Sequence, residues 1–381
     1  ITTFTMKNTI YKYFFHEFLR YFAITIFALA VIVWTIQSVN FLDLVTEDGH
    51  AFSIYFAYSF LTLSKILTKL IPFCFLLAII LTIVKLEKDN ELIILWASGL
   101  NKIYIVNLIF RISLIIMLLQ LILTSIINPK LLNLSRSLLK NSELQFIPSL
   151  LKEKQFNDTV KGLTIFVEKK DIDNRYKNIF IRDDGHILSD IGTTSSTIFA
   201  KSGHINTDKN NLILYDGVIQ KLKDDKTVTI VKFKTTSLNL SGISTKSISV
   251  PKMQETSTLK ILRCIKNNNT SIDMHNCSPT KKSFMDTKIE INKRFGMPIF
   301  IPLISLVCAF LLSSRNDKKI YDYNKYIYFL IGFSILTLSE IFVRYSGISW
   351  THTAIYYLLP LGMLPVFYLT LIRKFKYENL F

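Results

Sequence analysis

The chain has 381 residues, half of them hydrophobic, and a formal net charge of +17. A basic balance of this kind can indicate nucleic-acid binding, but no basic helix and no aromatic-plus-basic sheet motif accompanies it, so we expect no nucleic-acid partner. Motifs for a P-loop, a zinc protease, a serine hydrolase and a carboxylate pair are also missing, which excludes the enzyme classes that depend on them. We therefore predict no catalytic residue, no metal and no cofactor.

Six apolar stretches are each long enough to cross a bilayer as a helix, which takes about 20 residues with all backbone hydrogen bonds made internally. They cover residues 22–39, 60–84, 103–127, 295–312, 326–345 and 354–372. Lys65, Lys69 and Arg111 fall inside these stretches, but each lies near enough to an end for its long side chain to reach the interface. The sequence predicts an α-helical polytopic membrane protein with six transmembrane helices, three on each side of a hydrophilic insert.

Basic residues are concentrated in alternate connections between these stretches. The N-terminal segment, the loops 85–102 and 313–325, and the C-terminal segment carry Lys and Arg, whereas residues 43–58 carry acids only. Because Lys and Arg favour the cytoplasmic side, we place both termini and these two loops in the cytoplasm, and the insert outside. The first stretch has no small-residue cleavage site after it, so we interpret it as a retained helix.

The insert, residues 128–292, changes its pattern at Gly162. Short β-branched and aromatic runs, separated by turn signals, follow at residues 163–167, 178–181, 196–200, 212–215, 218–222 and 228–240. Six such runs are typical of an all-β sandwich or open roll. Residues 133–156 are expected to form a helical entry segment. The predicted domains are 1–127, 128–292 and 293–381.

The four cysteines fall into two pairs. Cys74 and Cys308 lie within apolar stretches, where a thiol usually serves for packing. Cys264 and Cys277 lie in the insert, thirteen residues apart, on either side of His275. A disulfide between them in an oxidising compartment is one interpretation, and free thiols are the other. A metal site is disfavoured, because three candidate ligands at this spacing match no zinc pattern.

The loop between the second and third stretches contains a short amphipathic helix. Asn90 is a candidate N-cap, Leu92, Leu95 and Trp96 fall on one stripe, and Gly99 can end the helix in the left-handed conformation. Such a helix can lie flat at the membrane interface. Alternatively, it is a knob that docks in a groove of a cytoplasmic motor, which would suit a chain that has no nucleotide site of its own.

Several motifs occur in an order that is found in a known family. They are Asp89-Asn-Glu91-Leu leading to Trp96-Ala-Ser-Gly99, then Asn128-Pro129, then Gly162-Leu-Thr-Ile-Phe-Val-Glu168, and finally Ile289-Glu290-Ile-Asn-Lys-Arg294 before Pro298. With them the chain resembles the LptF/LptG permeases of the lipopolysaccharide export machine, an ATP-binding-cassette transporter of Gram-negative inner membranes. The family also has the three-plus-three topology, cytoplasmic termini and a β-jellyroll insert, so the resemblance covers nearly the whole chain. Residues 35–43 and the motif at Gly162 are more similar to LptF than to LptG.

The resemblance implies partners and a coupling site. The partners would be an LptG-like sister permease, an LptB-like cytoplasmic ATPase, an LptC-like periplasmic protein, membrane lipid and lipopolysaccharide itself. The family's coupling helix corresponds here to Asp89, Glu91, Leu92, Leu95, Trp96 and Gly99. Glu91 is the best single candidate, and an acid that merely favours the helix dipole is its plainer interpretation. The jellyroll-like insert would stack edge to edge with a partner's like-shaped domain and pass acyl chains along its interior.

A lipopolysaccharide molecule would need an apolar cavity for its acyl chains and cations at the rim for its phosphates. The available cations are Lys65 and Lys69, one turn apart, and Arg344 at the outer end of the fifth stretch. Ordinary snorkelling is the alternative for all three, and Arg344 can also pair with Glu340 four residues earlier. The apolar wall would come from the first and fifth stretches, which in the family form a lateral gate with the sister subunit.

The chain departs from the family at one place. Family members often carry basic residues at the outer end of the first stretch, where this chain has Gln37 and Asn40. Two other functions compete with the one that the family implies. A permease of another lipid or lipoprotein exporter is the first, although such permeases generally have four spans. A membrane-anchored periplasmic scaffold is the second, and it would need neither a coupling helix nor a substrate-sized cavity.

Overall fold

The computed structural model describes residues 2–46, 51–142, 153–156, 158, 162–171, 175–184, 195–206, 211–222, 227–239, 252–267, 281–313 and 318–378. The chain divides into two compact units. The helical unit comprises residues 1–35, 62–133 and 252–381, and the sheet unit comprises residues 36–61 and 134–251. The domain boundaries predicted at 127 and 292 stay predictions.

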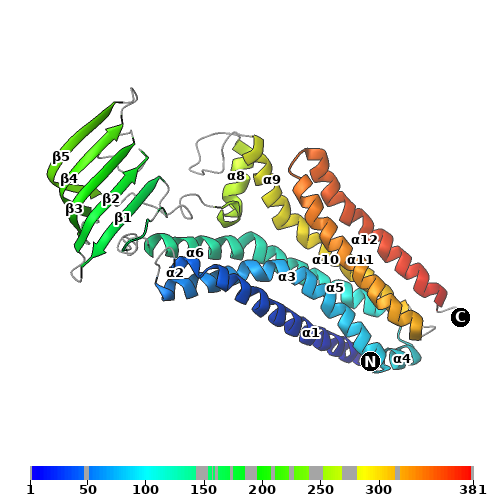
Figure 1. Ribbon diagram of the computed structural model, residues 1–381. Coiled ribbons are helices and arrows are strands. Elements are labelled where there is room, and N and C mark those ends of the chain that lie inside the picture. The colour runs from blue at the N-terminus through cyan, green and yellow to red at the C-terminus, as the bar shows by residue number, and fades with distance from the viewer. Residues whose placement is uncertain are drawn as a thin grey trace. The chain divides into compact units, whose positions relative to one another are not determined.

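Six helices are long and apolar enough to cross a membrane. They are α1 (Thr2–Asn40), α3 (Phe52–Lys88), α5 (Lys102–Ile122), the run from α9 (Lys281–Gly296) into α10 (Phe300–Ala309), α11 (Lys318–Tyr345) and α12 (Trp350–Glu378), as Figure 1 shows. The helices extend beyond the predicted apolar stretches because the flanking polar residues continue the same backbone hydrogen-bond pattern. The prediction of a helical polytopic membrane protein with an inserted β domain is confirmed.

Short elements connect and cap these helices. They are α2 (Asp43–Thr46), α4 (Glu91–Ala97), the π-helix η1 (Leu123–Ile127), α6 (Asn128–Ser142), the 3-10 helix η3 (Met253–Glu255), α8 (Thr258–Asn267), η4 (Met297–Ile299) and η5 (Phe310–Ser313). The π-helix η1 joins α5 to α6 without a break, and one-turn π-helices of this kind are frequent at functional sites. Pro298 in η4 has no backbone N–H to donate, which explains why a 3-10 turn separates α9 from α10.

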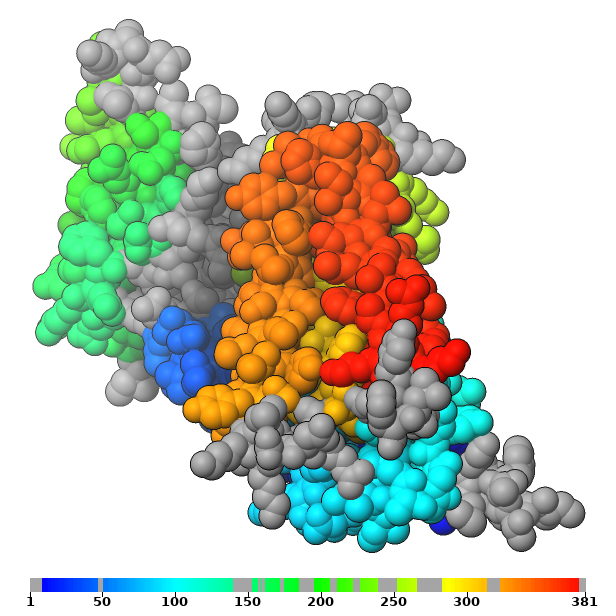
Figure 2. Space-filling model, turned by 90° about the vertical axis from the view of Figure 1, so that its right-hand side faces the viewer, coloured from blue at the N-terminus to red at the C-terminus, as the bar shows by residue number. Residues whose placement is uncertain are grey.

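Helix α10 forms the centre of the helical unit. All ten of its residues are buried, as expected for a helix that is apolar on every side. The same core receives Phe75 and Ile79 from α3, Ile109 from α5 and Phe375 from α12. The apolar windows of α1, α11 and α12 are instead only 6%, 17% and 17% buried. These three helices present an apolar outer surface for lipid or a membrane partner, and Figure 2 shows the α11 and α12 part of it in orange and red.

The sheet unit contains a five-stranded antiparallel sheet with the order β1-β2-β3-β4-β5. The strands are β1 (Leu163–Lys170), β2 (Arg175–Asp183), β3 (Ser196–Asn206), β4 (Asn211–Leu222) and β5 (Val228–Asn239), and Figure 1 shows them side by side. Because each strand pairs with its neighbour in sequence, this sheet is a meander. Ile165, Ile181, Ile198 and Ile219 pair in register across four strands and are buried together in one apolar core.

Two of the predicted strands are a single strand. The runs on either side of Asp216 and Gly217 both belong to β4, although these two residues look like a turn in the sequence. Asp216 has a φ of 48°, which its short polar side chain tolerates, and the pairing resumes at Gly217 in an unchanged register. A side chain at position 217 would collide with the Phe233 ring and the Phe199 carbonyl oxygen. The two residues therefore let the strand continue.

The predicted helical entry segment, residues 133–156, is helical as far as Ser142. Glu153 instead forms an isolated parallel bridge with Val167 of β1, so the prediction is wrong for this end of the segment. The reason is tertiary: the end of the segment pairs with the backbone of the first strand rather than with its own next turn.

The cysteines also separate into two groups. Cys74 and Cys308 are buried and free, which agrees with a packing role. Cys264 of α8 is buried and disulfide-bonded. Cys277 lies outside the described residues, so the pairing of Cys264 with Cys277 stays a prediction.

Candidate functional site

A cavity of about 430 Å³ lies in the helical unit, between α3, η1, α9 and α11. Part of its wall is apolar and is formed by Pro72, Phe73, Met297, Phe333 and Leu336. The remainder is polar and carries basic and acidic side chains from α3, α9 and α11. An apolar wall with a few convergent polar groups is typical of a ligand-binding site.

Lys65 and Lys69 lie one turn apart on α3, and both line the cavity. Residues four apart on a helix share a face, so the two ammonium groups are neighbours. Among the residues that the structure describes, the ammonium group of neither lysine forms an ion pair or a hydrogen bond. Two adjacent cations without a counter-ion repel each other, and an anionic ligand would relieve that repulsion. This pair is the cavity's clearest chemical signal.

A third cation of the cavity wall already has a partner. Lys293 of α9 donates from Nζ to both carboxylate oxygens of Glu340 on α11, at 3.2 and 3.4 Å. Glu340 therefore pairs with Lys293, and not with Arg344 as the sequence also allowed. Arg344 lies one turn further along α11, is exposed, and is not among the residues that line the cavity. The structure brings Lys65 and Lys69 together and leaves Arg344 outside.

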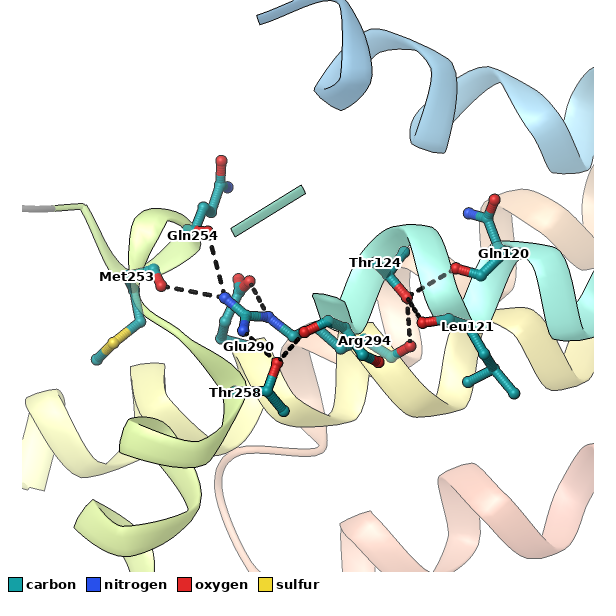
Figure 3. A network of polar contacts seen from close by, with 9 residues as sticks. Gln120, Leu121, Thr124, Met253, Gln254, Thr258, Glu290 and Arg294 are labelled. Carbon is teal, nitrogen blue, oxygen red and sulfur yellow. Dashed lines mark hydrogen bonds and ion pairs between the residues drawn. The ribbon is translucent and has the colours of Figure 1, made fainter. Parts of the chain in front are cut away.

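The fourth cation, Arg294, is buried and hydrogen-bonded to several groups of the chain, as Figure 3 shows. Its Nε donates to Glu290 at 2.9 Å, and its Nη1 donates to the Thr258 hydroxyl at 2.8 Å. Its Nη2 donates to the backbone carbonyls of Met253 and Gln254, at 3.3 Å each. With a side chain only 3% exposed, Arg294 fastens η3 and the start of α8 to α9 and uses four of its five N–H donors within the chain.

The π-helix η1 and the turn before it complete the polar wall beside this network. Thr124 Oγ1 donates to the backbone carbonyl of Arg294 at 2.9 Å, a contact that is visible in Figure 3. Gln120 donates from Nε2 to the Thr68 carbonyl at 2.6 Å. The Oε1 atom of Gln120 is buried and has no hydrogen-bond partner within the described part of the chain. An unused acceptor in a cavity wall is a position that a ligand hydroxyl or amine can satisfy.

Sequence reasoning found two of these residues and missed the others. Lys293 and Glu340 were not selected as a pair, because they are far apart in sequence and only the packing of α9 on α11 joins them. Gln120 was missed although it is a polar side chain inside an apolar stretch, which is itself a functional signal. A search for polar residues inside the predicted spans would have found it.

Helix α4, at a distance from this cavity, ends as predicted but begins differently. Gly99 has a φ of 82°, and the N–H groups of Gly99 and Leu100 donate to the carbonyls of Trp96 and Leu95, the Schellman arrangement. Asn90 was predicted to cap the helix with its side chain, and that prediction is wrong. Asn90 is itself left-handed, with a φ of 58°, a conformation that its short polar side chain tolerates, and it makes no side-chain cap bond.

The predicted apolar stripe of α4 faces inward. Leu92 is 1% exposed, and Leu95 and Trp96 pack on the core of the helical unit. Ile93 and Ile94, which sequence reasoning did not select, are exposed instead. The stripe therefore holds α4 against the bundle and leaves Ile93 and Ile94 on its exposed side. In Figure 2 this end of the unit is the cyan surface below α11 and α12.

Glu91 and Asp89 surround a lysine together with side chains from α1. The Tyr13 hydroxyl donates to Glu91 Oε1 at 2.9 Å, and Lys85 Nζ donates to the same hydroxyl at 3.0 Å. The Lys85 ammonium also lies 3.4 Å from Glu17, 3.8 Å from Glu91 and 3.9 Å from Asp89. Glu91 is thus engaged within the chain, in a cluster that links α4 to α1 and α3. We call these five residues the Lys85 cluster.

Comparison with known proteins identifies one family. The family model of the lipopolysaccharide export system permease LptF/LptG matches residues 12–374, which is nearly the whole chain. A protein of Rickettsia prowazekii (strain Madrid E), named uncharacterized protein RP871, is 31% identical over 238 residues. The aligned region covers 61% of this chain and 64% of that protein, so it spans a little under two thirds of the relative.

Proposed function

This chain belongs to the LptF/LptG family of lipopolysaccharide export system permeases, and on that premise we propose that it binds lipopolysaccharide in its cavity and passes it toward the outer membrane. It would act as one permease subunit of an ATP-binding-cassette transporter, the LptF-like one. The observation that carries the proposal is the pair of lysines, Lys65 and Lys69, which have no counter-ion among the described residues and stand beside an apolar wall.

The size and chemistry of the cavity suit one part of such a molecule. Ligand cavities generally measure about 300 to 1,000 Å³, and one of about 430 Å³ holds a phosphorylated sugar head but not several acyl chains. Each charge-assisted hydrogen bond from a lysine to a phosphate contributes roughly 1.5 to 3 kcal/mol. The acyl chains would lie along the exposed apolar faces of α1 and α11, where Phe27 and Leu330 are among the exposed side chains.

The length of α3 supports a placement of the two sites on opposite membrane faces. Lys65 and Lys85 are 20 residues apart on this one helix, which is about 30 Å at 1.5 Å per residue. That distance equals the thickness of the hydrocarbon core. With the cytoplasmic termini that the distribution of Lys and Arg predicts, the cavity would open on the periplasmic side of the inner membrane and α4 would lie in the cytoplasm.

The partners follow from the surfaces that the chain leaves free. An LptB-like ATPase would dock on the exposed side of α4, on Ile93 and Ile94, because the chain has no P-loop of its own. An LptG-like sister would cover the apolar faces of α1 and α11, and an LptC-like periplasmic protein would pair with the sheet. In this proposal Glu91 acts by holding α4 in position through the Lys85 cluster.

Site-specific photo-crosslinking tests the proposed function. Photo-reactive residues at positions 65 and 69, in the complex assembled in its native membrane, should capture lipopolysaccharide in preference to phospholipid. Position 344 serves as the comparison, because Arg344 is exposed on α11 and does not line the cavity. Capture of phospholipid alone at 65 and 69 would contradict the proposal and would favour simple snorkelling of both lysines. Recovery of the chain with no ATPase would favour a scaffold.

A further inference from the structure

We propose that Glu340 is an exchangeable counter-ion, which neutralises Lys293 while the cavity is empty and gives way to an anionic headgroup when one binds. This inference rests on the proposed function and adds to it a determinant of specificity. Lipids with several negative charges would be selected over the zwitterionic phospholipids that surround them.

The cavity wall carries four basic and two acidic side chains. They are Lys65, Lys69, Lys293 and Arg294, and Glu290 and Glu340. Two of the cations are unpaired among the described residues, and two are each matched by one carboxylate. The two ion pairs have the same composition, one cation from α9 and one glutamate, so a comparison between them is direct.

The Arg294–Glu290 pair is shielded from water. Its side chains are 3% and 14% exposed, and the guanidinium makes further hydrogen bonds to Thr258 and to two backbone carbonyls. Removal of Glu290 from Arg294 would leave a buried cation with fixed neighbours and no counter-ion, which is strongly unfavourable. This pair is a permanent part of the wall.

The Lys293–Glu340 pair is accessible to water. Its side chains are 32% and 45% exposed, and its atoms lie 3.2 Å apart at the closest approach. A half-exposed pair of this kind contributes little to stability, because water solvates both charges almost as well as they solvate each other. Glu340 can therefore leave Lys293 and remain hydrated, while Lys293 turns to another anion at the same cavity wall.

The competition between Glu340 and the ligand would depend on ligand charge. A phosphate monoester carries more negative charge than a carboxylate and three acceptor oxygens, and it would also contact the free Lys65 and Lys69. A zwitterionic headgroup brings its own ammonium group, which Lys65 and Lys69 repel. Glu340 thus favours strongly anionic lipids, because a weakly anionic headgroup carries too little charge to displace the Glu340 carboxylate from Lys293.

The test compares lipid capture by wild type and by Glu340→Gln. A photo-reactive residue at Thr337, another residue of the cavity wall, reports which lipid enters when the assembled complex is mixed with lipid A and phosphatidylethanolamine. Wild type should favour lipid A. Glu340→Gln frees Lys293 for either lipid, so the preference should fall by up to about fivefold, the most that a half-exposed ion pair supplies. Asp286→Asn removes an exposed carboxylate of α9 that does not line the cavity and should leave the ratio unchanged.

The outcomes separate the two proposals. If wild type captures no lipid A at position 337, the proposed function itself fails. If wild type captures lipid A but Glu340→Gln has the same preference as Asp286→Asn, only the counter-ion role is overturned. Should Glu340→Gln not accumulate in the membrane, the double variant Lys293→Gln/Glu340→Gln leaves no unpaired charge. It should capture less lipid A than wild type because one phosphate contact is gone, and equal capture would overturn the counter-ion role.

Discussion

Helix α3 carries lysines in two opposite electrostatic settings. At one end, Lys85 lies within 4 Å of three carboxylates and donates to the Tyr13 hydroxyl. Toward the other end, Lys65 and Lys69 face a cavity and have no ion pair among the described residues. The residue type and the helix are the same, so the difference lies in what the rest of the chain places around them. A lysine enclosed by acids fixes structure, whereas a lysine that is left without them can bind an anion from outside.

The same contrast occurs within the cavity wall. Arg294 is enclosed by Glu290, Thr258 and backbone carbonyls, and it joins α9 to η3 and α8. The free lysines of α3 form no such joint. Variants of enclosed cations should therefore change assembly and stability, and variants of the free cations should change ligand binding and leave stability nearly intact.

The largest expected effect concerns membrane topology: the Lys85 cluster and the cavity with Lys65 and Lys69 should lie at opposite faces of the membrane. A cysteine at Ser98, exposed beside α4, should react with an impermeant thiol reagent only after the inner membrane is permeabilised. A cysteine at Thr235, exposed on β5, should react without permeabilisation. The signal is all or none, because the hydrocarbon core excludes a charged reagent. The opposite pattern at these two positions would reverse the topology and remove the cavity from the periplasmic side.

Removal of the enclosed Arg294 side chain should have the next largest effect, a loss of folding stability. Arg294→Met leaves the Glu290 carboxylate, only 14% exposed, without its partner, and the loss of one member of a buried pair typically costs about 3 to 5 kcal/mol. The thermal or denaturant unfolding of the purified protein measures this change. Arg344→Met is the matched control, since it removes an exposed arginine and should change stability by less than about 0.5 kcal/mol. Equal effects of the two variants would show that the network in Figure 3 is not a structural joint.

Charge reversal of the free lysines should act on binding and not on folding. Lys65→Glu or Lys69→Glu removes a contact worth roughly 1.5 to 3 kcal/mol, so lipopolysaccharide capture should fall by about tenfold to a hundredfold for each variant and further for the double variant. Lys65→Arg/Lys69→Arg keeps both charges and should retain most of the capture. Melting temperatures should stay close to that of wild type. Normal export by the double reversal would assign the phosphate contacts to the sister subunit.

The smallest expected effect distinguishes two roles of Glu91. If Glu91 positions α4 through Tyr13, then Glu91→Gln keeps an acceptor for the Tyr13 hydroxyl and should reduce ATPase recovery by only about fivefold, which corresponds to about 1 kcal/mol. Glu91→Lys places a second cation beside Lys85 and should reduce recovery much more. Tyr13→Phe, although it lies on α1, should resemble Glu91→Gln. A loss with Glu91→Gln as large as that with Glu91→Lys, together with normal recovery for Tyr13→Phe, would instead indicate direct contact of the carboxylate with the ATPase.

Local chemistry explains what the sequence predicted correctly. The six helices depend on apolar length alone, because a helix makes its backbone hydrogen bonds internally. Lys65 and Lys69 could be placed together because residues four apart on a helix share a face. Gly99 was placed correctly at the end of α4 because only a residue without a Cβ adopts a φ of 82° at no steric cost.

The features that the sequence did not predict depend on contacts between distant residues. Tyr13 and Glu91 are 78 positions apart, and nothing near Glu91 in sequence reveals that its carboxylate is already engaged. Glu340 had a local candidate partner in Arg344, but the packing of α9 on α11 gives it Lys293. The stripe of Leu92, Leu95 and Trp96 was recognised, while the side of α4 that faces the bundle was not, because periodicity shows that a helix has an apolar face and not what covers it.

The central claim is that the two free lysines of α3 bind the anionic head of lipopolysaccharide while Lys85 does not. The most direct measurement is amine labelling of the purified complex with and without lipopolysaccharide, quantified for each lysine by mass spectrometry. Lys130, exposed on α6, is the reference. The account predicts that lipopolysaccharide lowers the labelling of Lys65 and Lys69 several-fold and leaves Lys130 and Lys85 unchanged. Labelling of Lys65 and Lys69 that is the same with and without lipopolysaccharide would contradict it.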